Sequence, residues 1–380
     1  MPGGRVDWAQ LARPSLAGLD PYDPGASRDA IKAEHGLADL QPLNWNEDMF
    51  GPPPGALDAA AAEVRRAALY PERAYADFRA AVAEWRGVPA ECIVPAHGAQ
   101  ALISAIASVF VDPGTAVVIP QPTYGLYAQV CAAGGAAVAR VPADGLAFDL
   151  AAIAAAARSA SARLVWLCDP NNPTGLLMGR DEWERFLEAL PHGCVAVVDE
   201  AYADFADPGV SVRRERDVLD GRAVIVIRSF SKIFGLAGLR LGYAVCDPAV
   251  ADLLSIVQEP FNVNRVALAA GRAAVATPGF VERRRAEVAD ARAAFARALE
   301  GTGIEVTPSQ SNFMLVRLGV DDGPVCDRLM RRGILIRAGT TVGLPGYARV
   351  TMAPAPLMHT VAGELLAAIG AAAEPGAPSV

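Results

Sequence analysis

The chain has 380 residues, a length typical of two domains or of one large domain with a smaller one attached. Hydrophobic residues make up 52% of it, which is enough for a sizeable core. The formal net charge of −8 argues against a nucleic acid or an anionic membrane surface as a partner.

The cysteines are scattered, and their spacing is not that of a disulfide framework or of a metal site. They are Cys92, Cys131, Cys168, Cys194, Cys246 and Cys326. Unpaired cysteines are typical of a reducing compartment. The first residues lack the apolar segment of a secretion signal, and no stretch of 18 residues is uniformly apolar. We therefore expect a cytoplasmic protein with no metal and no membrane span.

Residues 1–45 are divided by prolines into short pieces. We expect an N-terminal arm that lies on another part of the molecule or on a partner subunit. Alanine-rich helices are predicted at 57–69 and at 75–86, the second one ending at Gly87 and Pro89.

Short apolar runs that alternate with helical segments follow, as in a doubly wound α/β fold. The runs show little polar alternation, so both faces of the sheet should be covered. We predict a mostly parallel sheet of seven strands in a large domain at 46–262. The strands are expected near 92–95, 116–119, 137–141, 164–167, 195–198, 224–227 and 241–245.

The remaining residues, 263–380, are expected to form a smaller α+β domain. A long helix is predicted at 280–299 and a final one at 357–373. Apolar runs at 304–306, 313–317 and 334–337 indicate a small sheet.

Polar motifs follow three consecutive strands of the large domain. Residues 169–175 follow the fourth run, Asp199 the fifth and Lys232 the sixth. Ligands of open α/β sheets bind at the carboxyl ends of the strands, so these motifs should meet at one site.

Lys232 is one of only two lysines, the other being Lys32, among 34 basic residues. A partly desolvated lysine can lose its proton and form a Schiff base, which arginine cannot do. With Ser229, Ser231 and Arg240 nearby, this lysine suggests a site for an aldehyde cofactor that carries a phosphate. The alternative is an ordinary surface lysine in a loop.

The segment 229–242, Ser-Phe-Ser-Lys-Ile-Phe-Gly-Leu-Ala-Gly-Leu-Arg-Leu-Gly, resembles the lysine signature of fold-type I aminotransferases that use pyridoxal 5'-phosphate (PLP). The resemblance implies that Lys232 holds PLP as a Schiff base. It also implies that Ser229, Ser231 and Arg240 bind the cofactor phosphate.

Asp199 comes directly after a buried strand, where a carboxylate needs a partner. The pyridinium nitrogen of PLP would supply one, and Tyr202 could donate a hydrogen bond to the phenolic oxygen of the cofactor. The alternative for Asp199 is a helix N-cap. The segment 169–175 alone favours a turn. The resemblance implies that its Asn172 contacts the same phenolic oxygen.

The turn before residue 99 opens an apolar helix, whose N-terminus can bind a phosphate. By resemblance Ala99 and Gln100 contact the cofactor phosphate, although an ordinary βα turn would have the same pattern. Tyr124 could stack on the cofactor ring or be a core residue. Tyr70 matches a tyrosine that reaches the neighbouring subunit's cofactor phosphate, which implies a homodimer.

The motifs 19–25, 43–47, 260–264 and 337–349 resemble the histidinol-phosphate aminotransferase branch of the family. Arg337 and Arg349 could each bind a substrate carboxylate or phosphate, or lie on the surface. By resemblance Arg349 binds the anionic end of the substrate. Phe50 stands where the branch has a substrate-binding tyrosine.

The chain is therefore predicted to be a PLP-dependent transaminase that moves an amino group between an amino donor and a 2-keto acid such as 2-oxoglutarate. A PLP-dependent decarboxylase similar to threonine-phosphate decarboxylase, or a lyase or cyclase of specialised metabolism, shares the fold. A non-catalytic regulator is a remote third possibility.

Overall fold

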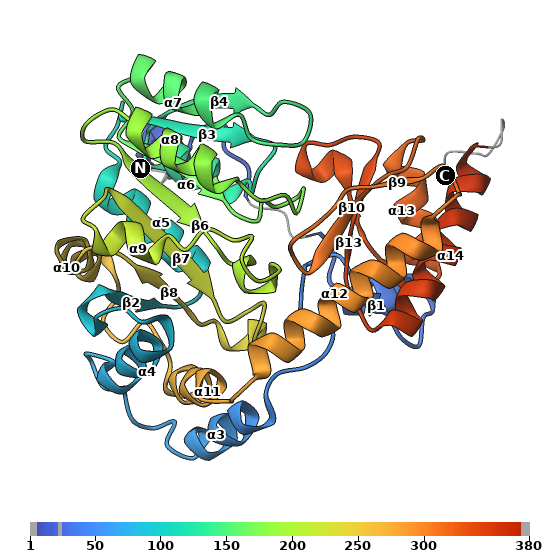
Figure 1. Ribbon diagram of the computed structural model, residues 1–380, viewed down its shortest axis with the longest axis horizontal. Coiled ribbons are helices and arrows are strands. Elements are labelled where there is room, and N and C mark those ends of the chain that lie inside the picture. Colours follow the sequence, from blue (N-terminus) through green and yellow to red (C-terminus); the bar gives the residue numbers. More distant parts are fainter. Residues whose placement is uncertain (1–5, 22–24, 374–380) are drawn as a thin grey trace, which may run out of the picture.

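The computed structural model describes residues 6–21 and 25–373 of the chain. Figure 1 shows a large central sheet with helices on both faces and, at the other end of the molecule, a small sheet packed against helices. The 20-residue helix α12 (Phe280–Leu299) runs from one part to the other.

The central sheet has the seven strands expected from the sequence, and its order is β2-β8-β7-β6-β5-β3-β4. Only β8 runs antiparallel to its neighbours, so the predicted mostly parallel sheet is confirmed. The strands are β2 (Ile93–Ala96), β3 (Ala116–Gln121), β4 (Ala137–Pro142), β5 (Leu164–Cys168), β6 (Val195–Asp199), β7 (Val224–Ser229) and β8 (Gly242–Val245).

Both faces of the sheet are buried, because alternate side chains of each strand enter different clusters. Val117 and Ile119 of β3 belong to a buried cluster that includes residues of α5, α6 and α10, whereas Val118 belongs to a different cluster that includes residues of α7, α8 and α9. Continuous apolar strands are what this two-sided covering requires. The helices are α4 (Ala76–Arg86), α5 (Ala99–Phe110), α6 (Leu126–Ala133), α7 (Leu150–Ser159), α8 (Arg180–Ala189), α9 (Glu215–Leu219) and α10 (Pro248–Val257).

The small domain is built on an antiparallel sheet of order β12-β13-β10-β9. Its strands are β9 (Glu305–Val306), β10 (Phe313–Arg317), β12 (Arg337–Ala338) and β13 (Tyr347–Thr351), and α13 (Asp322–Arg331) and α14 (Ala355–Ala373) accompany them. The single strand expected at 334–337 is two: β11 (Ile334–Leu335) leaves this sheet and pairs with β1 (Gln41–Pro42).

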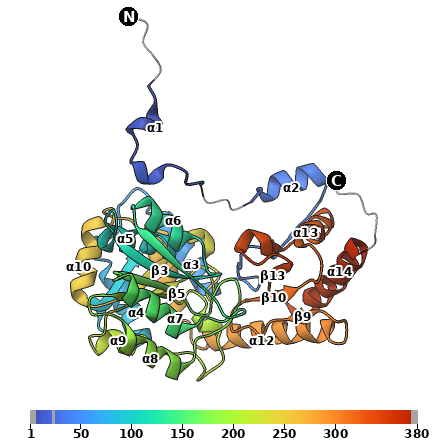
Figure 2. The ribbon, with the colours of Figure 1, turned by 90° about the horizontal axis from the view of Figure 1, so that it is seen from above.

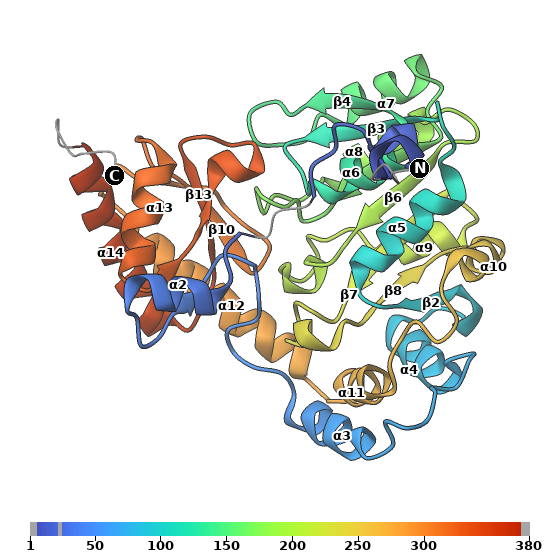
Figure 3. The same cartoon turned by 180° about the vertical axis from the view of Figure 1, so that it is seen from behind.

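The contacts of α11 and of residues 41–42 favour domain boundaries that differ from the expected ones. Helix α11 (Arg265–Val275) packs against α3 (Pro54–Val64) and α4, as Figures 1 and 3 show, although the sequence assigned it to the small domain. Residues 41–42, assigned to the arm, instead form β1 on the small domain. We propose that the large domain extends through α11 and that the small domain begins with α12.

The N-terminal segment lies mostly outside the two domains. Helix α1 (Trp8–Leu11) stands away from the body in Figure 2, and the exposed fraction of Trp8 is 75%. Helix α2 (Arg28–His35) returns to the small domain, where Ile31 packs with Leu40 and Leu335. The motif at 19–25 lies partly outside the described residues.

Helix α14 is long and apolar enough to cross a membrane by length and composition alone. One of its faces is a core face, because Met358, Val361 and Leu365 are fully buried, and the helix packs against α12 and α13. This packing explains its apolar composition.

Candidate active site

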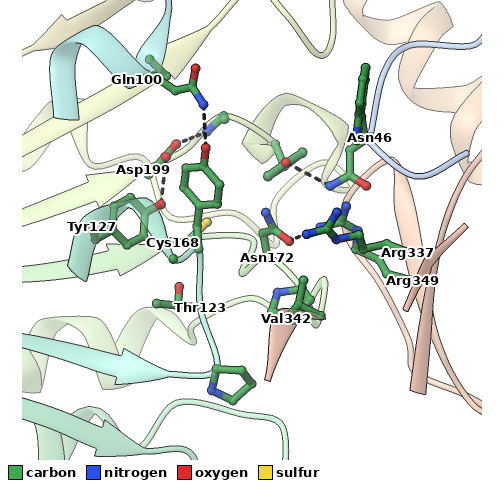
Figure 4. A pocket seen from close by; sticks show the side chains of 18 of the residues that line it. Asn46, Gln100, Thr123, Tyr127, Cys168, Asn172, Asp199, Arg337, Val342 and Arg349 are labelled. Carbon is green, nitrogen blue, oxygen red and sulfur yellow. Dashed lines mark hydrogen bonds between the residues drawn. The ribbon is translucent and has the colours of Figure 1, made fainter. Parts of the chain in front are cut away.

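A cavity of about 830 Å³ lies where the carboxyl ends of β5, β6 and β7 face the small domain. This volume is within the range of small-molecule sites. Figure 4 shows Asp199 and Tyr127 on one side of the cavity, Arg337 and Arg349 on the other, and Asn172 between them. The three polar motifs predicted to meet at the strand ends do meet there.

Lys232 follows β7 and lines the cavity. Its Nζ donates hydrogen bonds to the backbone oxygens of Trp45, at 3.0 Å, and Asn46, at 2.9 Å. Burial and the charge of Arg349 lower the pKa of Lys232 to about 8, although Glu47 opposes this shift. An appreciable fraction of the amine is therefore neutral near pH 7, which a lysine nucleophile requires.

Asp199 is the last residue of β6 and is only 5% exposed. One carboxylate oxygen accepts a hydrogen bond from Tyr127 Oη at 2.9 Å, and the other accepts one from the backbone nitrogen of Ala201 at 3.0 Å. Burial raises the pKa of Asp199, and these two hydrogen bonds and the charge of Lys232 counteract part of that rise. A cation bound in the cavity beside Asp199 would lower this pKa further.

A group of hydrogen-bond donors lies where α5 begins. Gly98 precedes the helix with φ +82, and a Cβ at this position would lie 2.8 Å from a guanidinium nitrogen of Arg240. Gly242 of β8 allows a similarly close approach, since a Cβ there would lie 2.7 Å from the nitrogen of Ala99. Two glycines thus bring Arg240 beside the helix N-terminus, where anions bind.

The other predicted phosphate-binding residues belong to the same group. Ser229, Ser231 and Gln100 line the cavity, and Gln100 accepts a hydrogen bond from Arg240 at 3.3 Å. The side-chain amide of Gln100 also donates to Tyr124 Oη at 2.7 Å. Hydroxyls, a guanidinium and free backbone N–H groups are the donors that suit a phosphate.

Arg349 crosses from β13 of the small domain to the large domain. Although only 6% exposed, it lines the cavity, where it donates hydrogen bonds to Asn172 Oδ1 and, at 2.7 Å, to the backbone oxygen of Asn44. Arg337 of β12 lines the same side and is half-buried. These arginines make the small-domain side of the cavity suitable for an anionic substrate group.

Two predicted site residues do not line the cavity. The guanidinium of Arg284 lies over the ring of Phe50 at 5.2 Å and also pairs with Asp48. Phe50 is not among the residues that line the cavity, and a contact between Phe50 and substrate stays a prediction. Tyr70 is 78% exposed and stacks on Phe261, with 4.8 Å between the ring centroids. It lies outside this chain's own cavity.

Sequence reasoning gave no role to Asn46, Tyr127 or Cys168, all of which line the cavity. Asn46 is 1% exposed, and its side-chain nitrogen donates to Tyr202 Oη at 3.1 Å. The tyrosines at 124 and 127, three residues apart at the start of α6, offered the only sequence signal for Tyr127. Asn46 lies in the motif 43–47, which indicated a branch of the family but no contact of the Asn46 side chain, because its partners are far away in the sequence.

The match to known families agrees with this geometry. Residues 38–365 match the model of the family "Aminotransferase class I and II". The chain belongs to this family. A histidinol-phosphate aminotransferase of Symbiobacterium thermophilum is 38% identical to this chain over 340 residues. The alignment covers 90% of this chain and 93% of that relative. One from Nitrosococcus oceani is 35% identical over 343 residues, 90% of the chain and 92% of the relative.

Solved structures of the family have the same fold. Histidinol-phosphate aminotransferase from Sinorhizobium meliloti, in complex with pyridoxal-5'-phosphate, superposes on this chain with a TM-score of 0.86 at 29% sequence identity. The superposition covers 94% of this chain and 97% of the Sinorhizobium chain. An L-threonine-O-3-phosphate decarboxylase from Porphyromonas gingivalis superposes with a TM-score of 0.74 at 24% identity, covering 86% and 98%. The second likeness shows the shared fold alone.

Proposed function

We propose that this chain is a PLP-dependent aminotransferase that takes its amino group from histidinol phosphate or a similar donor and passes it to a 2-keto acid such as 2-oxoglutarate. The observation that carries the proposal is the position of the Lys232 amine, with its pKa lowered to about 8, between the Asp199 carboxylate and the arginines of the small domain. The similarity to histidinol-phosphate aminotransferases supports the choice of donor.

The residues around the cavity fit PLP. Arg240 and the N-terminus of α5 are held together by glycines in a cradle suited to the phosphate, and Ser229, Ser231, Ala99 and Gln100 complete it. Asp199 would face the ring nitrogen, and Asn172 and Tyr202 would face the phenolic oxygen. Tyr124 would stack on the ring and Lys232 would hold the cofactor covalently. When bound, PLP supplies an electron sink for the substrate carbon that loses a proton.

The chain's own groups supply the remaining chemistry. Because the pKa of Lys232 is about 8, its amine can accept a proton from the substrate carbon and return it at neutral pH. Asp199 remains a carboxylate when a cation faces it. Arg349 binds the anionic end of the substrate and is held in place by Asn172.

We also propose that the enzyme is a homodimer in which Tyr70 reaches the partner's cofactor phosphate. Support comes from the exposure of this tyrosine and of Phe261, on which it stacks, and from further exposed apolar residues between positions 57 and 69, namely Leu57, Val64 and Leu69. Single surface apolar residues need no explanation, but several of them in the segment that leads to an exposed tyrosine favour an interface. A cytoplasmic location is proposed from the six free cysteines.

The test uses the visible absorbance that PLP gains when it is bound to lysine. Histidinol phosphate should abolish this absorbance in the purified protein, and 2-oxoglutarate should restore it. Borohydride should link the cofactor to the peptide that contains Lys232. Lys232→Ala should lose both signals, whereas Lys32→Ala, which removes the only other lysine, should keep them.

Two results would contradict the proposal: a protein that never gains the absorbance with PLP, or borohydride labelling that survives Lys232→Ala. Loss of absorbance with phenylalanine but not with histidinol phosphate would keep the transaminase and replace the donor. Release of carbon dioxide without recovery by 2-oxoglutarate would favour the decarboxylase instead.

A further inference from the structure

Asn46 occupies an unusual position in the chain. It lies on the connection between β1 and α3, it is 1% exposed, and its backbone has φ +54. Residues other than glycine rarely adopt this left-handed conformation, although asparagine tolerates it better than most. Such a backbone persists only where surrounding contacts hold it, and these places are often functional.

Five hydrogen bonds hold Asn46, one of which Thr351 Oγ1 donates to its side-chain oxygen at 3.4 Å. Its backbone nitrogen donates to Thr351 Oγ1 at 3.1 Å, and its backbone oxygen accepts from Lys232 Nζ at 2.9 Å and from Asn312 Nδ2 at 3.0 Å. Its side-chain nitrogen donates to Tyr202 Oη at 3.1 Å. One residue therefore contacts both the amine and the phenol of the cavity through different groups.

The direction of the bond to Tyr202 has a consequence. A phenol has one hydrogen to donate and an oxygen that accepts. Because the Asn46 amide occupies the acceptor side of Tyr202 Oη, the phenol hydrogen remains available for a second acceptor. The Tyr202 side chain lines the cavity, so an anionic oxygen bound there is the acceptor that this arrangement suits.

We propose that Asn46 is a positioning residue for both Lys232 and Tyr202: its side-chain amide makes Tyr202 a donor toward the cofactor, and its left-handed backbone places the carbonyl that orients the Lys232 amine. The part that concerns the cofactor rests on the proposed function; the part that concerns Lys232 does not. Three requirements meet at this position, namely a left-handed backbone, a side-chain donor and a short side chain. Asparagine satisfies all three.

Three substitutions separate these roles. Asn46→Gly keeps the left-handed backbone and the carbonyl but removes the amide. Asn46→Asp keeps the shape but can only accept, so the Tyr202 hydroxyl should turn toward it and away from the cavity. Asn46→Ala removes the amide and also disfavours the left-handed backbone, so the carbonyl should move.

The side-chain role is tested by PLP binding and by the pH midpoint of the visible absorbance of the PLP-bound protein. Asn46→Gly should weaken PLP binding about three- to tenfold, the effect of one hydrogen bond, and Asn46→Asp should weaken it more. Both variants should raise the pH midpoint of the visible absorbance. A donor such as Tyr202 stabilises the anionic form of the cofactor's phenolic oxygen, and both variants weaken that donor. In a double-mutant cycle, Asn46→Gly should add nothing to Tyr202→Phe, since the amide acts through that hydroxyl.

The backbone role is tested without cofactor. In a Lys32→Arg background Lys232 is the only lysine, so the pH dependence of its acetylation, followed by mass spectrometry of its peptide, reports its pKa. Asn46→Gly should leave that midpoint near the parent value of about 8. Asn46→Ala should lower it by about one unit, because hydrogen bonds from the ammonium group to the carbonyls favour the charged form.

The proposal is overturned if Asn46→Gly binds PLP as tightly as the parent with an unchanged midpoint, or if its effect adds fully to that of Tyr202→Phe. It is also overturned if the glycine and alanine variants shift the acetylation midpoint equally. Failure of the parent protein to bind PLP would instead refute the proposed function, and the acetylation experiment would still decide the role of the carbonyl. Thermal denaturation of each variant confirms that it is folded.

Discussion

The substitution Gly98→Ala tests the proposed phosphate cradle. Gly98 has φ +82 and ψ 167, a combination that is essentially restricted to glycine. An added Cβ would lie 2.8 Å from a guanidinium nitrogen of Arg240 and 3.3 Å from its Cζ. Because these atoms are the end of a flexible side chain, Arg240 should move and α5 should stay in place.

Two costs follow from this geometry. The backbone strain should lower the free energy of unfolding by about 1–3 kcal/mol. Displacing Arg240 should remove a charge-assisted hydrogen bond to the cofactor phosphate, typically about 1.5–3 kcal/mol, so PLP should bind roughly tenfold to a hundredfold more weakly.

Gly193 is the matched control. It has the same φ of +82, but no atom lies within 4 Å of the Cβ that would be added there. Gly193→Ala should therefore lower thermal stability without changing PLP affinity. The assay is a fluorescence titration of the cofactor-free protein with PLP and with pyridoxal, which lacks the phosphate, and each variant's stability is followed by circular dichroism.

The reasoning is refuted if the alanine variants at 98 and 193 bind PLP equally well. It is also refuted if Gly98→Ala weakens pyridoxal as much as PLP, because the effect would then not involve the phosphate. A Gly98→Ala protein that is as stable as the parent would contradict the strain argument alone.

Three further predictions follow from the site and from the ion pairs behind it. Acetylation of Lys232 in the cofactor-free protein should be half-maximal near pH 8, and a midpoint near 10.5 would show that the amine is not desolvated. Arg349→Lys should lower kcat/KM about tenfold to a hundredfold through substrate binding, because lysine cannot bind a carboxylate in a bidentate way while also reaching Asn172; unchanged steady-state kinetics would contradict this. Arg86 lowers the pKa of Asp204 from 3.8 to about 2, so this carboxylate stabilises the fold above pH 4 and loses that effect as the pH falls through 2. Asp204→Asn should therefore cost about 2 kcal/mol in urea unfolding at pH 7 and less at pH 3, whereas an equal cost at both values would reject the pairing.

Much of the fold could be predicted because the signals are local. Runs such as 224–227 are apolar and β-branched and become central strands, and the polar motifs that follow them meet at the sheet edge. The small domain was harder, since β13, which carries Arg349, is a short run of mixed polar and apolar residues, Tyr-Ala-Arg-Val-Thr. Lys232 was recognisable from its scarcity and its context.

The parts that could not be predicted depend on long-range contacts. Asn46 is important because its backbone is left-handed and its partners are 156 to 305 residues away, which no local pattern encodes. Phe50 stands where the branch has a substrate-binding tyrosine, but no local pattern predicts that the cation of Arg284, 234 residues further along the chain, lies over its ring. Tyr70 is exposed, as its proposed role toward a partner's cofactor requires.

The segment that contains β1 connects the small domain with the Lys232 site of the large domain. Residues 41–43 are hydrogen-bonded to Gly333 and Leu335 of the small domain, and the next residues present their carbonyls to Lys232 of the large domain. The two oxygens that accept hydrogen bonds from the Lys232 amine therefore belong to a segment anchored on the small domain, so the small domain helps to fix where the amine lies.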